Sequence, residues 1–163
     1  MSRATERTVR LSVLDRLIDE APREAADAPG TWEASLAELR VRLMRDVEWI
    51  LNTRRTIADP PAGCPELTRS VYAFGLPDIS SMAESEEVRT ELARSVADCV
   101  ETFEPRLMAV RVIPRATTLA AGRGFHFTIE ALLRLDPSPE KVVFDTVVET
   151  VSGRVSVSGG ADA

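Results

Sequence analysis

The sequence holds few of the residues that build catalytic and metal centres. Its 163 residues include one histidine, His126, and two cysteines, Cys64 and Cys99. Zinc sites need clustered Cys and His ligands, and Ser-His-Asp or Cys-His centres need a histidine base. His126 lies in the middle of a predicted strand. We therefore expect no metal, no cofactor and no catalytic residue.

Aromatic residues and long hydrophobic runs are also scarce. Aromatic residues make up 5% of the chain, which is poor for a sugar-binding groove. No apolar run approaches the ~18–20 residues that span a bilayer, and the charged first 17 residues do not resemble a signal peptide. We expect no membrane insertion and a protein that stays in the cytoplasm. Both cysteines are then free thiols, with Cys99 in the core.

Lysine is nearly missing, since Lys141 is the single lysine among 20 basic residues. The formal net charge of −6 argues against nucleic acid as a partner, because binding to nucleic acid depends on neutralising phosphates. The remaining basic residues are arginines, whose planar forked donors suit carboxylates at protein interfaces. The composition therefore favours protein partners.

The length fits one domain, preceded by an arm. Residues 1–30 form this arm, in which Leu11, Leu14, Leu17 and Ile18 have helix-like spacing before a stretch rich in Ala, Pro and Gly. A frayed terminus and a short docking helix both remain open. We expect a single domain over residues 31–158 and a disordered tail over residues 159–163.

The first long helix is predicted over residues 35–53. Ser35 and Glu38 have the spacing of a capping box, and Arg42 and Asp46 are placed to pair weakly on the outer face. The apolar residues form one face: Leu36, Leu39, Leu43, Val47, Ile50 and Leu51.

The second long helix is predicted over residues 83–103. Ser81 and Glu84 repeat the capping spacing, and Pro105 ends the helix because proline cannot continue it. Its apolar positions recur every three or four residues: Val88, Leu92, Val96, Cys99, Val100 and Phe103.

Beyond residue 106 the hydrophobic period changes to two, which indicates strands. They are predicted over residues 107–114, 124–135 and 141–151, with a hairpin turn at Ser152-Gly153 into a fourth. One face of the second strand is apolar: Phe125, Phe127, Ile129, Ala131, Leu133 and Leu135. The predicted class is α+β, with N-terminal helices packed on a C-terminal antiparallel β-meander of three to four strands.

The triplet Glu104-Pro105-Arg106 follows the second predicted helix. Pro105 fixes its φ angle and turns the chain, so two opposite charges lie on a stiff corner. A helix stop with two solvated charges and a charged corner that a partner recognises both remain open.

An enzyme that cleaves glycosidic bonds is the alternative that needs least machinery, because two carboxylates are enough. Glu48 and Glu104 are the candidates for a peptidoglycan-cleaving, lysozyme-like muramidase. Arg45 and Arg106 lie beside them in sequence and favour the ionised carboxylates, which suits ion pairing better than proton donation.

Four stretches, taken in order, resemble the TssE family, the small wedge subunits of contractile-tail baseplates in their type VI secretion form. They are LSVLDRLIDEAP (11–22), RDVEWILNTRR (45–55), SVYAFGLPDIS (70–80) and ETFEPRL (101–107). Ala73 and Phe74 depart from the usual form of the third stretch. A wedge protein from a phage or another contractile particle is a related alternative.

The resemblance implies a structural role without enzymatic activity, in a baseplate near the inner membrane. Glu104, Pro105 and Arg106 are then expected to contact the core bundle of the larger wedge subunits. Further partner-binding residues are expected in the first helix and just after it: Arg45, Glu48, Asn52, Thr53 and Arg54.

The resemblance also implies that strands of the contractile sheath subunits add to the sheet. Residues 148–158 alternate and carry little charge, so an exposed edge there needs a cover. A partner strand and the N-terminal arm are the two alternatives for that cover.

Overall fold

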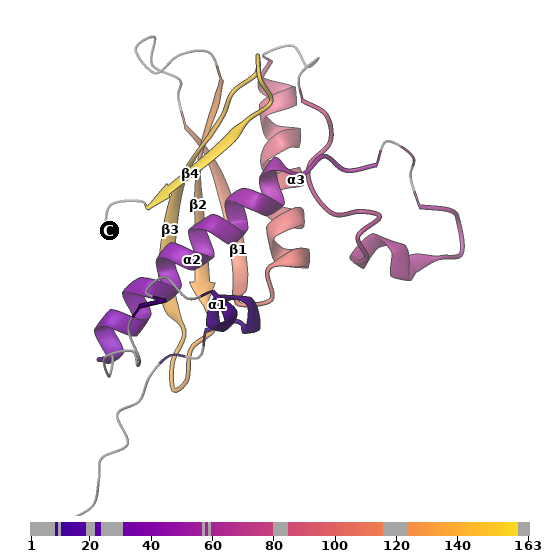
Figure 1. The fold of residues 1–163 in the computed structure, drawn as a ribbon. Coiled ribbons are helices and arrows are strands. Elements are labelled where there is room, and N and C mark those ends of the chain that lie inside the picture. The colour runs from indigo at the N-terminus through magenta and orange to yellow at the C-terminus, as the bar shows by residue number, and fades with distance from the viewer. Residues whose placement is uncertain are drawn as a thin grey trace, which may run out of the picture. The chain divides into compact units, whose positions relative to one another are not determined.

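The computed structural model describes residues 9, 11–18, 22–23, 31–56, 58, 60–79, 85–115 and 124–159. Helices occupy the first part of the chain and strands the last part (Figure 1), which confirms the predicted α+β class. The elements are α1 (Val13–Leu17), α2 (Trp32–Asn52), the 3-10 helix η1 (Pro65–Arg69), α3 (Glu86–Phe103), β1 (Leu107–Arg115), β2 (Phe125–Leu133), β3 (Glu140–Val148) and β4 (Val155–Gly159).

The chain divides into two compact units, Met1–Leu43 and Met44–Ala163. In the first unit, Asp15 of α1 is buried and pairs with Arg42 of α2 at 3.5 Å. Arg42 also pairs with Glu38, one helical turn earlier, at 2.6 Å. The predicted pairing of Arg42 with Asp46 is therefore wrong, because Arg42 is itself buried and takes its partners within the first unit.

The apolar side chains of the short helix α1 are exposed, although their spacing is helical. Ser12 caps the helix by accepting a hydrogen bond from the Asp15 amide at 3.1 Å. The exposed fractions range from 39% to 77% over Val13, Leu14, Leu17 and Ile18. Most of the remaining arm, residues 1–30, lies outside the described residues.

Both long helices exist, but neither begins at its predicted cap. Helix α2 starts at Trp32, where Thr31 Oγ1 accepts from the Ala34 amide at 3.2 Å, and Ser35 instead donates to the Thr31 carbonyl. Helix α3 starts at Glu86, capped by Ser85 through the Val88 amide. The predicted cap at Ser81 lies outside the described residues. Thr31 and Ser35 lie near the start of α2, and Ser80, Ser81 and Ser85 precede α3, so spacing alone cannot choose the cap.

The four strands form one antiparallel sheet in the order β1-β2-β3-β4, so the predicted meander is confirmed. The turn between β3 and β4 is closed by the Glu149 amide, which donates to the Arg154 carbonyl at 2.9 Å, with Gly153 at φ +68°. Gly159, predicted to begin the tail, is the last residue of β4. The predicted apolar face of β2 is buried along its length.

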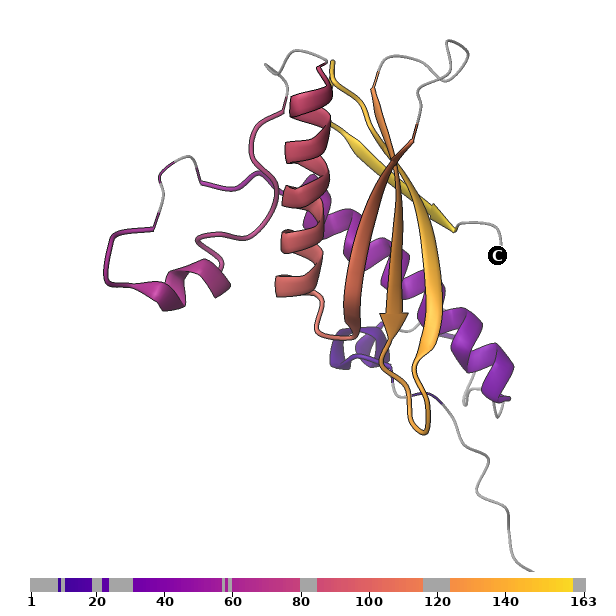
Figure 2. The ribbon, with the colours of Figure 1, turned by 180° about the vertical axis from the view of Figure 1, so that it is seen from behind.

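Helix α3 runs beside β1 and supplies much of the core of the second unit (Figures 1 and 2). Its buried residues are Leu92, Ala93, Val96, Cys99 and Val100. Cys99 is 6% exposed, which confirms its predicted core position. Seen from behind in Figure 2, no described helix of the second unit crosses the near face of the sheet.

Strand β1 forms one edge of the sheet and is irregular. Its pairing with β2 shifts register between Met108 and Arg111, and Ala109 adopts φ +53°. Bulges and prolines on edge strands hinder pairing with other chains, and Pro114 lies near the end of this strand. This edge therefore carries two features that oppose unplanned strand pairing.

A long loop joins α2 to α3 and is closed at its base. The Arg55 amide donates to the Leu76 carbonyl at 2.8 Å, and the Leu76 amide donates to the Thr53 carbonyl at 2.9 Å. Phe74 packs edge-on against Phe103 of α3, with ring centroids 5.0 Å apart. Residues 53–55 and 74–76 of the loop are thus held together, and Phe74 fixes the second of these segments against α3.

Candidate functional site

The corner after α3 is built from the predicted triplet, but Glu104 does not point outward. Glu104 caps the helix through its amide and is 3% exposed. Its carboxylate accepts hydrogen bonds from the Arg106 amide (3.0 Å), Nε (2.8 Å) and Nη2 (2.6 Å). In the isolated chain this carboxylate is therefore not solvated, which contradicts the reading of the triplet as two solvated charges. The turn at Pro105 brings the Arg106 guanidinium back over the Glu104 carboxylate, and this pairing offsets the cost of burying the carboxylate.

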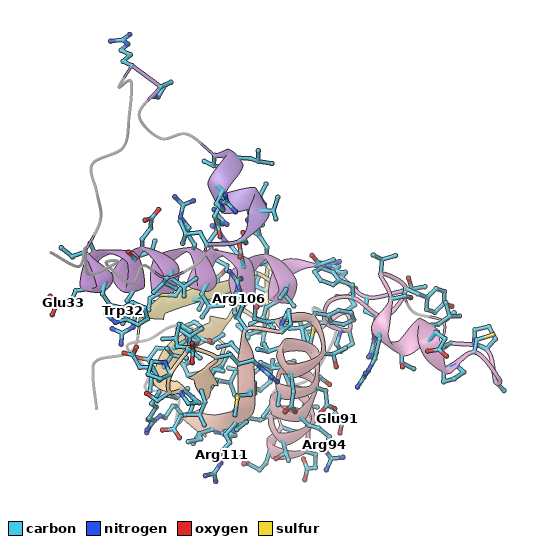
Figure 3. All side chains as sticks on the ribbon, turned by 90° about the horizontal axis from the view of Figure 1, so that it is seen from below. Trp32, Glu33, Glu91, Arg94, Arg106 and Arg111 are labelled. Atoms are coloured by element: carbon cyan, nitrogen blue, oxygen red, sulfur yellow. The ribbon has the colours of Figure 1, made fainter. Side chains whose placement is uncertain are left out.

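Arg106 also reaches across to α2, where Asp46 Oδ2 lies 2.6 Å from its Nη2 (Figure 3). Asp46 Oδ1 in turn accepts from Arg45 Nε at 3.0 Å and Nη2 at 2.7 Å. The hydrogen bonds that the Arg106 guanidinium donates chiefly to Glu104, and then to Asp46, raise its pKa, while burial opposes this. The triplet and the predicted residue Arg45 are therefore joined through Asp46.

Trp49 extends this arrangement to the surface of α2. The Arg45 guanidinium carbon lies 4.9 Å from the centroid of the Trp49 ring, a cation–π contact. Trp49 is 55% exposed, which is unusual for so large an apolar side chain. We use the term corner surface for these connected residues together with the exposed proline that precedes Arg106. They are Arg45, Asp46, Trp49, Pro105 and Arg106.

Sequence reasoning missed Asp46 as a link and Trp49 altogether. The pairing of Asp46 with Arg106 joins residues 60 positions apart, and no local pattern predicts it. Trp49 left a signal, because it is a large aromatic residue outside the apolar face predicted for its helix. Arginine and tryptophan are enriched among the residues that dominate binding energy at protein interfaces.

The predicted residues at the end of α2 are engaged within the chain itself. Asn52 and Glu48 bind backbone groups of β4. Thr53 and Arg54 lie at the base of the long loop, where Arg54 forms a bridge with Leu76 and pairs with Asp78 at 3.5 Å. The eight predicted partner-binding residues therefore form two groups. Four lie at the corner (Arg45, Glu104, Pro105 and Arg106), and four lie at or just after the end of α2 (Glu48, Asn52, Thr53 and Arg54).

The two carboxylates considered for glycoside cleavage are each engaged within the chain. Glu104 is bound by Arg106, and Glu48 accepts from the Val157 amide at 3.4 Å. A cavity of about 190 Å³ lies between the long loop and α3, and neither glutamate lines it. No cluster of three potential metal ligands occurs among the described residues.

A comparison with protein families identifies the family to which this chain belongs. A family profile described as baseplate wedge protein gp25 matches residues 37–138. The chain belongs to this family. The matched range contains most of α2, the long loop, α3, β1 and β2, and therefore every residue of the corner surface.

A search among proteins of curated function found no match. No helix in the described part of this gp25-family chain is long and apolar enough to cross a bilayer. The family assigns a structural role in a baseplate, and that role implies contacts with other baseplate proteins.

Proposed function

We propose that this gp25-family chain is a structural subunit of a type VI secretion baseplate, acting in the cytoplasm beside the inner membrane. It acts by contact alone, without catalysis, and binds the larger wedge subunits. The family match is the observation that supports this role. The leader stretch LSVLDRLIDEAP (11–22) favours the secretion system over a phage tail.

The corner surface is the proposed contact with the core bundle of the larger wedge subunits. It combines an exposed tryptophan with two arginines that share the Asp46 carboxylate, so its side chains are ordered before a partner arrives. Pre-ordered side chains lose less conformational entropy on binding. Pro105, which is exposed at the turn, completes the surface.

Strand addition by sheath subunits to the sheet is the second proposed activity of the subunit. Exposed sheet edges accept extended strands from other proteins, and the four-stranded sheet has two edges, β1 and β4. Through this contact the subunit helps to initiate the sheath.

Co-purification with the larger wedge subunits tests the proposed contact. We expect Trp49→Ala and Pro105→Gly to reduce recovery of the complex, while Arg94→Ala, an exposed residue on α3, leaves it unchanged. Normal recovery with both corner variants, each verified as folded by circular dichroism, would show that the core bundle binds elsewhere.

Absence of catalysis is tested by a zymogram on peptidoglycan. The purified chain is expected to give no clearing. Clearing that Glu48→Gln or Glu104→Gln abolishes would establish the muramidase alternative.

A further inference from the structure

The last two turns of α2 run alongside β4 in the opposite direction (Figure 1). Asn52 Nδ2 donates to the Val155 carbonyl at 2.7 Å, and the Val155 amide donates to Asn52 Oδ1 at 2.9 Å. One turn earlier, Glu48 Oε2 accepts from the Val157 amide at 3.4 Å. These contacts satisfy backbone groups on the outer edge of the sheet.

Every fourth residue of α2 can meet every second residue of β4, because these spacings along the helix and the strand are nearly equal. Four residues of an α-helix advance about 6 Å, and two residues of a strand advance about 6.7 Å. A third step follows the first two, since a Cβ added to Gly159 would lie 3.6 Å from Met44 Sδ. Helix positions 52, 48 and 44 thus face strand positions 155, 157 and 159.

Alternate residues of an edge strand direct their amide and carbonyl groups away from the sheet. Val155 and Val157 occupy such positions in β4, because their backbone groups bind α2 side chains. The Asn52 carboxamide supplies one donor and one acceptor to a single residue, which is the pair of bonds that a neighbouring strand supplies.

We propose that α2 closes the β4 edge as a surrogate strand, with Asn52 as the residue that positions it. In the folded subunit no partner strand then pairs with Val155 and Val157. This inference rests on the proposed function, because it excludes one of the two sheet edges from strand addition. Asn52 and Glu48 thereby act within the subunit and do not contact a partner.

The closure also protects the subunit from self-association. Strand β4 reads VSVSG, an alternating segment without charge. Such a segment on an open edge is a template for pairing with a second copy. Loss of the Asn52 side chain leaves the outward amide and carbonyl of Val155 without their partner.

Residue-resolved amide hydrogen exchange, together with sedimentation, tests the closure. In the wild-type chain the Val155 amide exchanges slowly, and Asn52→Ala accelerates this exchange about tenfold or more. Asn52→Asp retains an acceptor for the Val155 amide and preserves most of its protection. We also expect Asn52→Ala to self-associate at concentrations where the wild-type chain and the Glu91→Ala control, an exposed α3 residue, remain monomeric.

Several outcomes overturn the proposal. One is a Val155 amide that exchanges in the wild type as fast as an unstructured amide, and another is an Asn52→Ala chain that keeps both wild-type protection and the monomeric state. An Asn52→Ala chain that stays monomeric and protected but loses the larger wedge subunits makes Asn52 a partner contact. Failure of the wild-type chain itself to bind wedge subunits would contradict the proposed function alone, because exchange at Val155 is measured on the isolated chain.

Discussion

Asp46 of α2 and Arg106 of the turn after α3 form an ion pair at 2.6 Å. The pair joins two of the four stretches that carry the family resemblance, the end of the first long helix and the Glu-Pro-Arg triplet. Arg106 is 24% exposed at its side chain and Asp46 20%, so water screens the pair only in part. The pair therefore fixes the two stretches against each other within the subunit.

Arg106→Ala is expected to destabilise the isolated chain. It leaves the Glu104 carboxylate buried without its two hydrogen bonds from the Arg106 guanidinium, and only the bond from the backbone amide of residue 106 remains. Breaking a buried pair in this way costs about 3 kcal/mol. Urea unfolding measures the change in the free energy of unfolding.

Glu104→Gln provides the comparison for that experiment. It removes the charge but keeps the shape and an acceptor, so the expected cost is about 1–2 kcal/mol. Equal stability of Arg106→Ala and the wild-type chain would contradict the buried pairing. Loss of assembly in an Arg106 variant is attributable to contact only after this loss of stability has been measured.

Gly75→Ala is expected to destabilise the base of the long loop. Gly75 has φ +97°, and an added Cβ would lie 2.1 Å from the Thr53 carbonyl oxygen, a backbone atom that cannot move freely. We expect a loss of more than about 2 kcal/mol in the free energy of unfolding. Gly63→Ala is the matched control, because Gly63 has a similar φ of +94° with open space around it, and its cost is about 1 kcal/mol.

Trp49→Ala separates stability from binding. Its side chain is 55% exposed and contacts Arg45 through the ring, so the free energy of unfolding is expected to fall by less than about 1 kcal/mol. Affinity for the larger wedge subunits is expected to fall about tenfold or more. Thermal unfolding and titration calorimetry measure the two quantities. Unchanged affinity would show that Trp49 is not part of the proposed contact with the wedge subunits.

The two cysteines are expected to react very differently with iodoacetamide. Cys64 is exposed, whereas burial raises the pKa of the Cys99 thiol to about 11. Mass spectrometry should detect one modified thiol in the native chain and two after unfolding, and none in native Cys64→Ser. Modification of native Cys99 at pH 8 would contradict its burial.

The same shift predicts how stability changes with pH. The folded state holds the Cys99 proton more tightly than the unfolded state, whose thiol has a pKa of 9.0. The free energy of unfolding therefore falls as pH rises from about 9 toward 11. Cys99→Ala is expected to flatten this dependence, which urea unfolding at several pH values checks.

Periodicity predicted the order of the elements because each helix and strand has one strongly apolar face. It predicted the buried face of β2 for the same reason. The helix starts were missed, since Thr31 and Ser85 compete with nearby residues for the same capping role. Such competition is decided by the path of the preceding chain, which the local sequence does not contain.

The site was predictable in part. The sequence placed charges near residues 45 and 106, but not which charges are buried. Glu104 is enclosed because the turn folds Arg106 back over it, and Asn52 binds a strand more than one hundred positions later. The first contact depends on the path of the chain at the turn and the second on tertiary packing, so a short motif shows the residues without showing what they bind.

The paired amides at the base of the long loop isolate its tip from the rest of the subunit. Because Thr53 and Leu76 hold the two ends together, a change in length around Gly63 need not move α2 or α3. The tip thus offers an attachment point for a fluorescent or affinity tag, with which incorporation of the subunit into a baseplate could be followed.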